Sequence, residues 1–570
     1  MMDLQNSLLL PALIAIPFIT GFLCWLAEKI DPHWSKWTAI VGMVMTLGLT
    51  LFLWQAGEYH GLSQQILTSS HVPNWTAEYV LPWIPSFGIS FHLALDGLSL
   101  LMVMLTALLG IMAVACSWGE IQRRVGFFHL NLLFSLGGVI GVFLAVDLFL
   151  FFFFWEMMLL PIYFLIALWG HDAIGGKTKE YAATKFFIYT QASGLIMLIG
   201  ILMLIILHHG QTGVITFNYN ELLGTDLGQW EYVVMLLFFI GFAVKLPIVP
   251  FHGWLPDAHA QAPTAGSVDL AGILIKTAAY GLIRFVLPLF PTATQQFAPI
   301  AMTLGLIGVF YGAWLAFMQT DIKRLLAYTS VSHMGFVVLA IFAGTLLSLQ
   351  GLMIQMLAHG LSSAALFIMA GQLYERLHTR DLKLMGGMWG KMRYYPALLM
   401  FFCAALLGIP GTGNFIGEFL ILFGAFAQYP WYVVLATFSL VWAGLYSLIL
   451  IHQALFGDGD GDGKHIEQAL INQPANSQSA HKSKLSDIKV TYRDLNVREI
   501  GILLTLAVGL IWLGLFPQAF LDTSSNSMQW ITNAYQSNDY QPNAYQPNGH
   551  QSSQVTQDAS QSALHQATHQ

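Results

Sequence analysis

The chain has 570 residues, of which 56 % are hydrophobic and only 9 % are charged. A soluble particle of this size needs far more charge on its surface, so the apolar excess must face lipid. The formal net charge of -7 and the lack of a basic stripe argue against a nucleic-acid partner. We therefore expect an all-α integral membrane protein.

Runs of about 20 apolar residues, each long enough to cross a bilayer core, recur along the whole chain. The fourteen predicted spans lie near residues 6–26, 37–55, 96–116, 127–146, 147–169, 185–208, 231–250, 265–288, 297–318, 325–345, 350–372, 395–425, 430–454 and 498–520. The first run lacks a basic leader and a small-residue cleavage site, so we interpret it as a retained helix.

Basic residues test this count. Only Lys245, Lys276 and Arg284 of the 23 Lys and Arg fall inside predicted spans. The others lie in alternate connections or at their edges, whereas the stretch 55–95 and the tail after Leu521 have none. By the positive-inside rule the basic connections are cytoplasmic, and both termini lie on the opposite side.

Two segments are too polar for the membrane. Residues 457–497 form a polar cytoplasmic loop that opens with alternating Gly and Asp, and its Asp458 resembles the first ligand of a calcium loop. The twelfth position is Ala469 instead of a glutamate, so we expect a linker and no metal site. Residues 521–570 are rich in Gln, Asn and Ser, and we expect a disordered tail.

Ionisable residues inside the predicted spans are the strongest functional signal, because each one is costly in lipid unless it is paired or hydrated. They lie in six different spans: Glu156, Lys245, Lys276, His333, His359 and Glu418. A single intramembrane histidine often only packs, and a structural pair between Glu156 and one lysine would explain two of the six residues. A proton relay explains all six, because such groups exchange protons near neutral pH.

Two of these spans are predicted to be broken. Pro247 and Pro250 follow Lys245 in the seventh span, and residues 408–414 (Gly-Ile-Pro-Gly-Thr-Gly-Asn) interrupt the twelfth span before Glu418. Breaks at corresponding places favour two inverted five-helix repeats, spans 4–8 and 9–13. The expected organisation is a three-helix region (1–126), the two repeats (127–288 and 297–454), the polar loop (457–497), the last helix (498–520) and the tail (521–570).

The connection after the seventh span lacks Lys and Arg but contains His252, Asp257 and His259, and Asp269 lies two helical turns before Lys276 on the same face. An ordinary loop is one interpretation. A proton entrance to the relay fits equally well.

Residues 245–264 read Lys-Leu-Pro-Ile-Val-Pro-Phe-His-Gly-Trp-Leu-Pro-Asp-Ala-His-Ala-Gln-Ala-Pro-Thr. This stretch resembles the signature of the antiporter-like subunits of respiratory complex I and of multisubunit Na+/H+ antiporters. Glu418, where subunits L and N of complex I have lysine, and the lack of a long lateral helix after the last span separate the chain from those two subunits.

The resemblance implies a membrane-arm subunit of a proton-pumping NADH:quinone oxidoreductase in the bacterial inner membrane, with periplasmic termini and with L and N among its neighbours. It implies a Glu156–Lys245 pair, a central Lys276, a bridge through His333 and His359, and a terminal acid at Glu418. The chain itself would hold no cofactor; FMN, iron–sulfur clusters and quinone are expected in partner subunits. Subunits of a Na+/H+ antiporter or a membrane-bound hydrogenase are the alternatives within the family, and a non-conducting scaffold is the alternative outside it.

Overall fold

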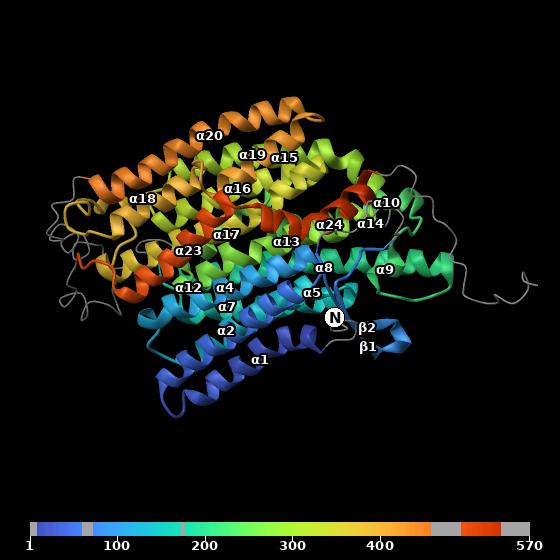
Figure 1. The fold of residues 1–570 in the computed structure, drawn as a ribbon, viewed down its shortest axis with the longest axis horizontal. Coiled ribbons are helices and arrows are strands. Elements are labelled where there is room, and N and C mark those ends of the chain that lie inside the picture. Colours follow the sequence, from blue (N-terminus) through green and yellow to red (C-terminus); the bar gives the residue numbers. More distant parts are fainter. Residues whose placement is uncertain (1–7, 60–71, 173–176, 458–491, 537–570) are drawn as a thin grey trace, which may run out of the picture.

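The computed structural model describes residues 8–59, 72–172, 177–457 and 492–536. Its helices run side by side along the long axis of the molecule (Figure 1). Among the described residues, thirteen helices are long and apolar enough to cross a membrane. The predicted twelfth span is present as two shorter apolar helices, so the all-α membrane fold is confirmed.

The N-terminal region contains three long helices and a small β-hairpin that the sequence analysis did not anticipate. In chain order the elements are α1 (Leu9–Ala27), α2 (Pro32–Ala56), β1 (Ala77–Ile84), β2 (Ile89–Leu95) and α4 (Gly97–Glu120). The strands are antiparallel, with Ala77 opposite Leu95 and an irregular register between Pro82 and Ile84. The hairpin lies in the predicted connection 55–95, at one end of the helix bundle (Figure 1).

The first repeat consists of helices α5 to α14. These are α5 (Val125–Leu144), α6 (Leu148–Met157), α7 (Leu159–Trp169), α8 (Lys179–Thr212), the short α9 (Tyr219–Leu222), α10 (Glu231–Lys245), α11 (Leu255–Gln261), α12 (Thr264–Asp269), α13 (Ile275–Gly281) and α14 (Leu287–Leu289). Two π-helical turns, Leu270–Leu274 and Leu282–Val286, join α12, α13 and α14 into one membrane span.

The second repeat and the C-terminal part follow. Their helices are α15 (Pro291–Phe317), α16 (Ile322–Ala343), α17 (Leu346–Leu377), α18 (Tyr395–Leu406), α19 (Gly413–Phe426), α20 (Pro430–Ile451), α23 (Val497–Leu515) and α24 (Gln518–Gln536).

Both predicted helix breaks are confirmed. The helix α10 ends at Lys245, and the chain resumes helical structure through Phe251–Trp254 and α11. The second break separates α18 from α19. Each break lies in the fourth helix of its five-helix unit, as expected for two inverted repeats.

The expectation of a disordered tail from residue 521 is wrong for its first part. Residues 518–536 form α24, which buries Phe520, Met528, Ile531 and Tyr535 against the bundle. Thr523, Ser524, Ser527 and Thr532 are buried with them, whereas other polar side chains, such as Gln518 and Asp522, stay at least partly exposed. A composition rich in Gln, Asn and Ser therefore conceals an amphipathic helix. The rest of the tail, and most of the 457–497 loop with the calcium-like segment, lie outside the described residues.

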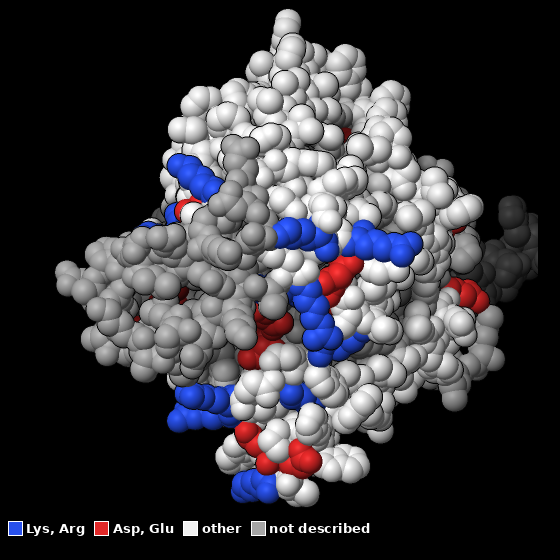
Figure 2. Space-filling view, turned by 90° about the vertical axis from the view of Figure 1, so that its left-hand side faces the viewer, with Lys and Arg blue, Asp and Glu red and all other residues white. Residues whose placement is uncertain are grey.

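Basic side chains gather at one end of the bundle, where the connections α1–α2, α4–α5, α7–α8, α15–α16 and α17–α18 lie; we call this the basic end. Figure 2 views the molecule from this end and shows Lys and Arg distributed over it. The other end of the bundle, which holds the hairpin, is called the opposite end. This arrangement follows the alternation predicted from the sequence.

The most deeply buried helices form the centre of the bundle. The span Thr264–Leu289 and the helix α17 are buried along their most apolar stretch, and α16 is nearly so, whereas only a third of that stretch is buried in α1, α2 and α20. Because the central helices are shielded by protein rather than lipid, polar side chains can persist there.

Candidate functional site

Four of the predicted intramembrane residues form a buried polar line across the centre of the bundle. Lys276 on α13 places its Nζ 2.8 Å from Nδ1 of His359 on α17. The ring of His359 lies 5.5 Å from that of His333 on α16, measured between centroids. His333 Nδ1 in turn lies 2.9 Å from Oε1 of Glu418 on α19. All four side chains are buried, so residues from four separate helices meet away from lipid.

The π-helical turn before Lys276 explains how its ammonium group is held. This turn, Leu270–Leu274, widens the helix, and the Lys276 Nζ donates a hydrogen bond to the carbonyl of Ala271, five residues earlier. Such π-turns occur frequently at functional sites. The ammonium group therefore has one fixed carbonyl partner on its own helix and one imidazole partner across the helix interface.

The far end of the line is held by two residues that the sequence analysis missed. Gln355 on α17 donates from Nε2 to Glu418 Oε1 at 3.2 Å. The Tyr446 hydroxyl on α20 lies 3.4 Å from Nε2 of His333. Both side chains are buried. Because Gln355 precedes His359 by four residues on a helix, it lies on the same face, and this spacing was the available signal.

Within the line, the two histidines are not directly hydrogen bonded. Both ring nitrogens of His333 have partners, Glu418 and Tyr446, whereas His359 Nε2 has none among the described residues. The polar line therefore consists of two halves, Lys276–His359 and His333–Glu418. Each half is joined internally by a polar contact, and no hydrogen bond joins the two histidine rings.

Glu156 and Lys245 lie near each other but do not form an ion pair within the described residues. Lys245, the last residue of α10, places its Nζ 3.7 Å from the centroid of the Trp155 ring, and neither this nitrogen nor the Glu156 oxygens has a hydrogen-bond partner there. The Glu156 carboxylate packs against Gly194 on α8, where an added Cβ would lie 1.8 Å from Oε1. A cation–π contact thus holds Lys245 beside the carboxylate rather than on it.

The predicted entrance residues separate into two groups. Asp269 on α12 accepts a hydrogen bond from the Ser135 hydroxyl at 2.6 Å, and its Oδ1 has no partner among the described residues. His259 on α11 is buried and stacks on Phe367, with ring centroids 4.6 Å apart. Burial and the charges of Lys323 and Lys276 lower the pKa of His259 to about 3, so this ring is neutral at neutral pH.

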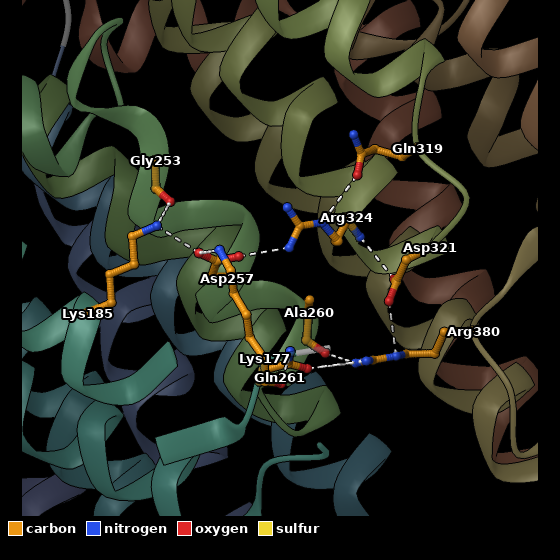
Figure 3. Close-up of polar contacts among 10 residues, drawn as sticks. All are labelled: Lys177, Lys185, Gly253, Asp257, Ala260, Gln261, Gln319, Asp321, Arg324 and Arg380. Carbon is orange, nitrogen blue, oxygen red and sulfur yellow. Dashed lines mark hydrogen bonds and ion pairs between the residues drawn. The ribbon is translucent and has the colours of Figure 1, made fainter. Parts of the chain in front are cut away.

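Asp257 and His252 lie at the basic end. Asp257 forms ion pairs with Lys177 (2.8 Å), Lys185 (2.7 Å) and Arg324 (2.8 Å), as Figure 3 shows. Burial alone would raise the pKa of Asp257, but these three cations hold it below its ordinary value. Asp257 therefore stays ionised at neutral pH, which suits an anchor between α8, α11 and α16 better than a proton entrance.

His252 remains partly exposed, with its ring against Tyr311 and Tyr328. Burial and the Lys185 charge lower its pKa, so it too is mainly neutral at neutral pH.

Two further side chains at the basic end, those of Glu120 and Lys323, also hold the site together, and the sequence did not indicate them. Glu120, at the end of α4, accepts the backbone N–H of Thr264 at 3.1 Å, while Lys323 Nζ donates to the carbonyl of Ala262 at 2.8 Å. These contacts hold the start of α12, the element that leads to Asp269 and Lys276. Nothing in the spacing of Glu120 marks this role, because its partners come from distant helices.

Comparison with known proteins identifies the class first. Residues 145–443 match the family described as NADH:quinone oxidoreductase/Mrp antiporter, TM. Respiratory complex I from Thermus thermophilus contains a chain with a TM-score of 0.76 and 27 % identity, covering 92 % of this chain and 99 % of that one. A chain of the Mrp complex from Dietzia shares the fold, with a TM-score of 0.72 at 20 % identity.

Relatives of higher sequence identity indicate which subunit within this class the chain resembles. NADH-quinone oxidoreductase subunit M of Escherichia coli K12 is 59 % identical over 532 residues, covering 92 % of this chain and 99 % of the relative. Subunit M of Pseudomonas aeruginosa is 58 % identical over 530 residues, covering 92 % and 98 %. The chain belongs to the NADH:quinone oxidoreductase/Mrp antiporter family, and within it to the subunit M branch.

Proposed function

We propose that this chain is a membrane-arm subunit of a proton-pumping NADH:quinone oxidoreductase and that it carries protons along its buried polar line. The observation that carries this proposal is the contact sequence Lys276–His359 and His333–Glu418 in the centre of the bundle. An amine, two imidazoles and a carboxylate can each take up and release a proton, whereas a scaffold has no use for them in a buried position.

In this proposal a proton enters from the basic end and loads Lys276. His259 and Asp269 lie between that end and Lys276, and the charge of Lys276 acts on His259. The proton then crosses through His359 and His333 and leaves by way of Glu418. Glu418 also borders a cavity of about 370 Å³ that is otherwise lined mainly by apolar side chains of α19 and α20, including Phe415.

The Glu156–Lys245 contact would act as the control element. With Lys245 on the Trp155 ring, the pair is open. Moving the Lys245 ammonium onto the carboxylate would weaken the positive charge that acts on Asp269, which lies seven residues before Lys276, and so would change the proton affinity of the line. Opening and closing of this pair would then gate the transfer.

Energy must come from partner subunits. Moving one charge against 100 mV costs about 2.3 kcal/mol. We place NADH oxidation and quinone reduction, with FMN and iron–sulfur clusters, in partner subunits of the complex, and antiporter-like subunits L and N among the neighbours in the membrane arm. The basic end would face the cytoplasm across the bacterial inner membrane, and the termini would face the periplasm.

The test is NADH-driven proton uptake by inside-out vesicles that carry Lys276→Ala or Glu156→Ala, with assembly checked on a native gel. We expect assembled complex in which pumping and quinone reductase activity both fall about tenfold or more, because a proton-transfer group is lost. Normal pumping by either assembled variant would support the scaffold interpretation. Pumping that depends on sodium in the unchanged protein would support the Na+/H+ antiporter alternative.

A further inference from the structure

Arg284 is a buried intramembrane cation that the proposed relay does not use. It lies in the π-helical turn Leu282–Val286 of the central span, with 1 % of its surface exposed. The guanidinium is paired with the carboxylate of Asp96, which caps the start of α4 at the opposite end of the bundle. Arg284 therefore lies on the same helix as Lys276, on the side towards the opposite end.

Lys276, Tyr280 and Arg284 follow one another at four-residue spacing, so they share one helix face. At about 1.5 Å per residue, Arg284 lies roughly 12 Å beyond Lys276 along the helix. The Tyr280 hydroxyl, between them, donates to the carbonyl of Phe143 at 2.9 Å. This row of polar groups is a second direction in which a proton on Lys276 could leave, and it is the direct one to the opposite end.

The surroundings of Arg284 keep its charge fixed in this row. The rings of Trp75 and Tyr280 lie 5.0 Å and 5.5 Å from the guanidinium carbon. The Asp96 carboxylate is also held by the Ser99 backbone N–H at 2.9 Å. The Arg284 guanidinium and the Ser99 N–H both stabilise the ionised form of the Asp96 carboxylate, so the two side chains form a charged pair.

The opposite side of the pair is closed by α24. A Cβ added at Gly97, the residue after Asp96, would lie 1.7 Å from the carbonyl oxygen of Thr523 on α24. The side chain of Ser527, also on α24, faces Asp96. A proton that left Lys276 along the row would therefore pass Tyr280 and then meet the guanidinium, the carboxylate and α24 in turn.

We propose that Arg284 is an electrostatic barrier that prevents protons on Lys276 from leaking directly to the opposite end, so that they cross laterally to Glu418. A guanidinium does not give up its proton in proteins, so it cannot pass a proton on, and its fixed charge repels an approaching one. Asp96, behind it, balances the charge and fixes the position of the guanidinium. The inference rests on the proposed function, because it requires that Lys276 carries protons.

A purely structural ion pair makes a different prediction. It would be replaceable by a neutral hydrogen-bonded pair at little cost, since replacing both partners of a buried pair is much milder than removing one. Under the barrier proposal the same neutral pair folds and assembles but loses the control of proton flow. The two interpretations separate on proton permeability.

The experiment measures the decay of an imposed pH difference across inside-out vesicles that contain the whole complex, without NADH. The variants are Arg284→Gln, the neutral pair Arg284→Gln with Asp96→Asn, and Arg284→Lys. Arg376→Gln is the matched control, because Arg376 is also a buried arginine paired with a carboxylate, Glu499 at 2.7 Å, but at the basic end. Assembly is checked on a native gel.

We expect the pH difference to decay several-fold faster with Arg284→Gln and with the neutral pair, and at the unchanged rate with Arg376→Gln. Arg284→Lys should leak at an intermediate rate, because a buried ammonium group can give up its proton whereas a guanidinium cannot. Adding Lys276→Ala to the neutral pair should abolish the leak, because the leak starts at Lys276. Should Arg284→Gln fail to assemble, the neutral pair alone decides the matter.

An unchanged decay rate in the assembled neutral pair would overturn the barrier. So would a leak that persists without Lys276. NADH-driven pumping by the single variant Lys276→Ala distinguishes failure of the proposed function from failure of the barrier. If this variant pumps normally, the proposed function is wrong. If it does not pump and the neutral pair still does not leak, only the barrier is wrong.

Discussion

At the scale of single residues, the position of the His333 ring depends on contacts to both of its nitrogens. Its Nδ1 contacts the Glu418 carboxylate and its Nε2 contacts the Tyr446 hydroxyl. Because both nitrogens have these partners, the ring makes no hydrogen bond with His359. In the proposed relay, a direct transfer between the two rings therefore requires one of these contacts to change. Tyr446 is therefore a positioning residue for this step.

Replacing Tyr446 with phenylalanine removes one hydroxyl and little volume. Since a neutral hydrogen bond contributes about 1 kcal/mol, we expect the pumping rate to change about fivefold and its pH profile to shift. Tyr395→Phe is the control, because Tyr395 is equally buried and bonds only the Met369 carbonyl, at 3.1 Å, outside the line. Identical pH profiles for the two variants would contradict the role of Tyr446.

For Asp257, in contrast to Tyr446, we expect a substitution to leave the pH profile of pumping unchanged. Burial raises its pKa, but three cations hold it below its ordinary value, so its ion pairs contribute stability above the unfolded pKa and lose it only as the pH falls through the folded one. Between about pH 6 and 8, far above the reference pKa of an aspartate, Asp257→Asn should lower the stability of the basic end by the same amount at every pH. It should leave the pH profile of pumping in place.

Measuring both the melting temperature and the pumping rate of Asp257→Asn over this range checks the prediction. A displaced pumping profile would restore Asp257 to the proton entrance.

At the scale of elements, the pattern of the sequence predicted the parts whose cause is local. Prolines and glycines marked both helix breaks, and charges in apolar runs marked the relay residues. The hairpin β1–β2 lies in a connection whose most prominent feature is its lack of basic residues, although its Tyr79, Val80, Ile89 and Phe91 are strand-forming residues that mark it. The helix α24 was missed because composition was used without periodicity.

Contacts between distant helices could not be predicted from one sequence. The pairing of Arg284 with Asp96, and of Tyr446 with His333, joins residues far apart in the chain, and no spacing rule connects them. The separation of Glu156 from Lys245 depends on the Trp155 ring. In the sequence this tryptophan looks like any other apolar residue of the span. The signal for such roles lies in packing rather than in pattern.

Helices α17 and α19, which carry His359 and Glu418, touch through glycine. A Cβ added at Gly424 would lie 2.4 Å from the backbone nitrogen of Ser348, so Gly424→Ala must push the helices apart. We expect a loss of about 1–3 kcal/mol in stability and weaker pumping, because the Gln355–Glu418 contact is stretched. Gly48→Ala, with nothing within 4 Å, is the control. Thermal melting of the complex and pumping assays would show equal behaviour only if this close packing were unimportant.

At the scale of the whole molecule, the basic end defines its orientation. Lys29 is exposed at this end, and Val214, half exposed, lies in a connection on the other side of the bundle. We expect a membrane-impermeant maleimide to label Lys29→Cys in inside-out vesicles and Val214→Cys in right-side-out vesicles. Cys24 and Cys403 are buried and Cys116 is only partly accessible, so an unsubstituted chain measures the background. The reverse labelling would contradict the proposed orientation.

The molecule as a whole is a buried line of titratable groups inside a shell of apolar helices. The proposed relay uses residues from both repeats, since Lys276 belongs to the first and His359, His333 and Glu418 to the second. His359 is the one residue of this line that contacts Lys276 across the boundary between the repeats. Removing its imidazole should separate the two halves while leaving Lys276 and Glu418 in place.

The most direct measurement is therefore the number of protons taken up per NADH oxidised by inside-out vesicles with His359→Phe, beside His129→Phe. His129 is also a fully buried histidine, but it bonds the Val125 carbonyl on its own helix and lies outside the line. We expect assembled complex in both, near-normal pumping in the control, and pumping reduced about tenfold or more in His359→Phe, because the contact to Lys276 is lost. Full pumping by an assembled His359→Phe complex would contradict it.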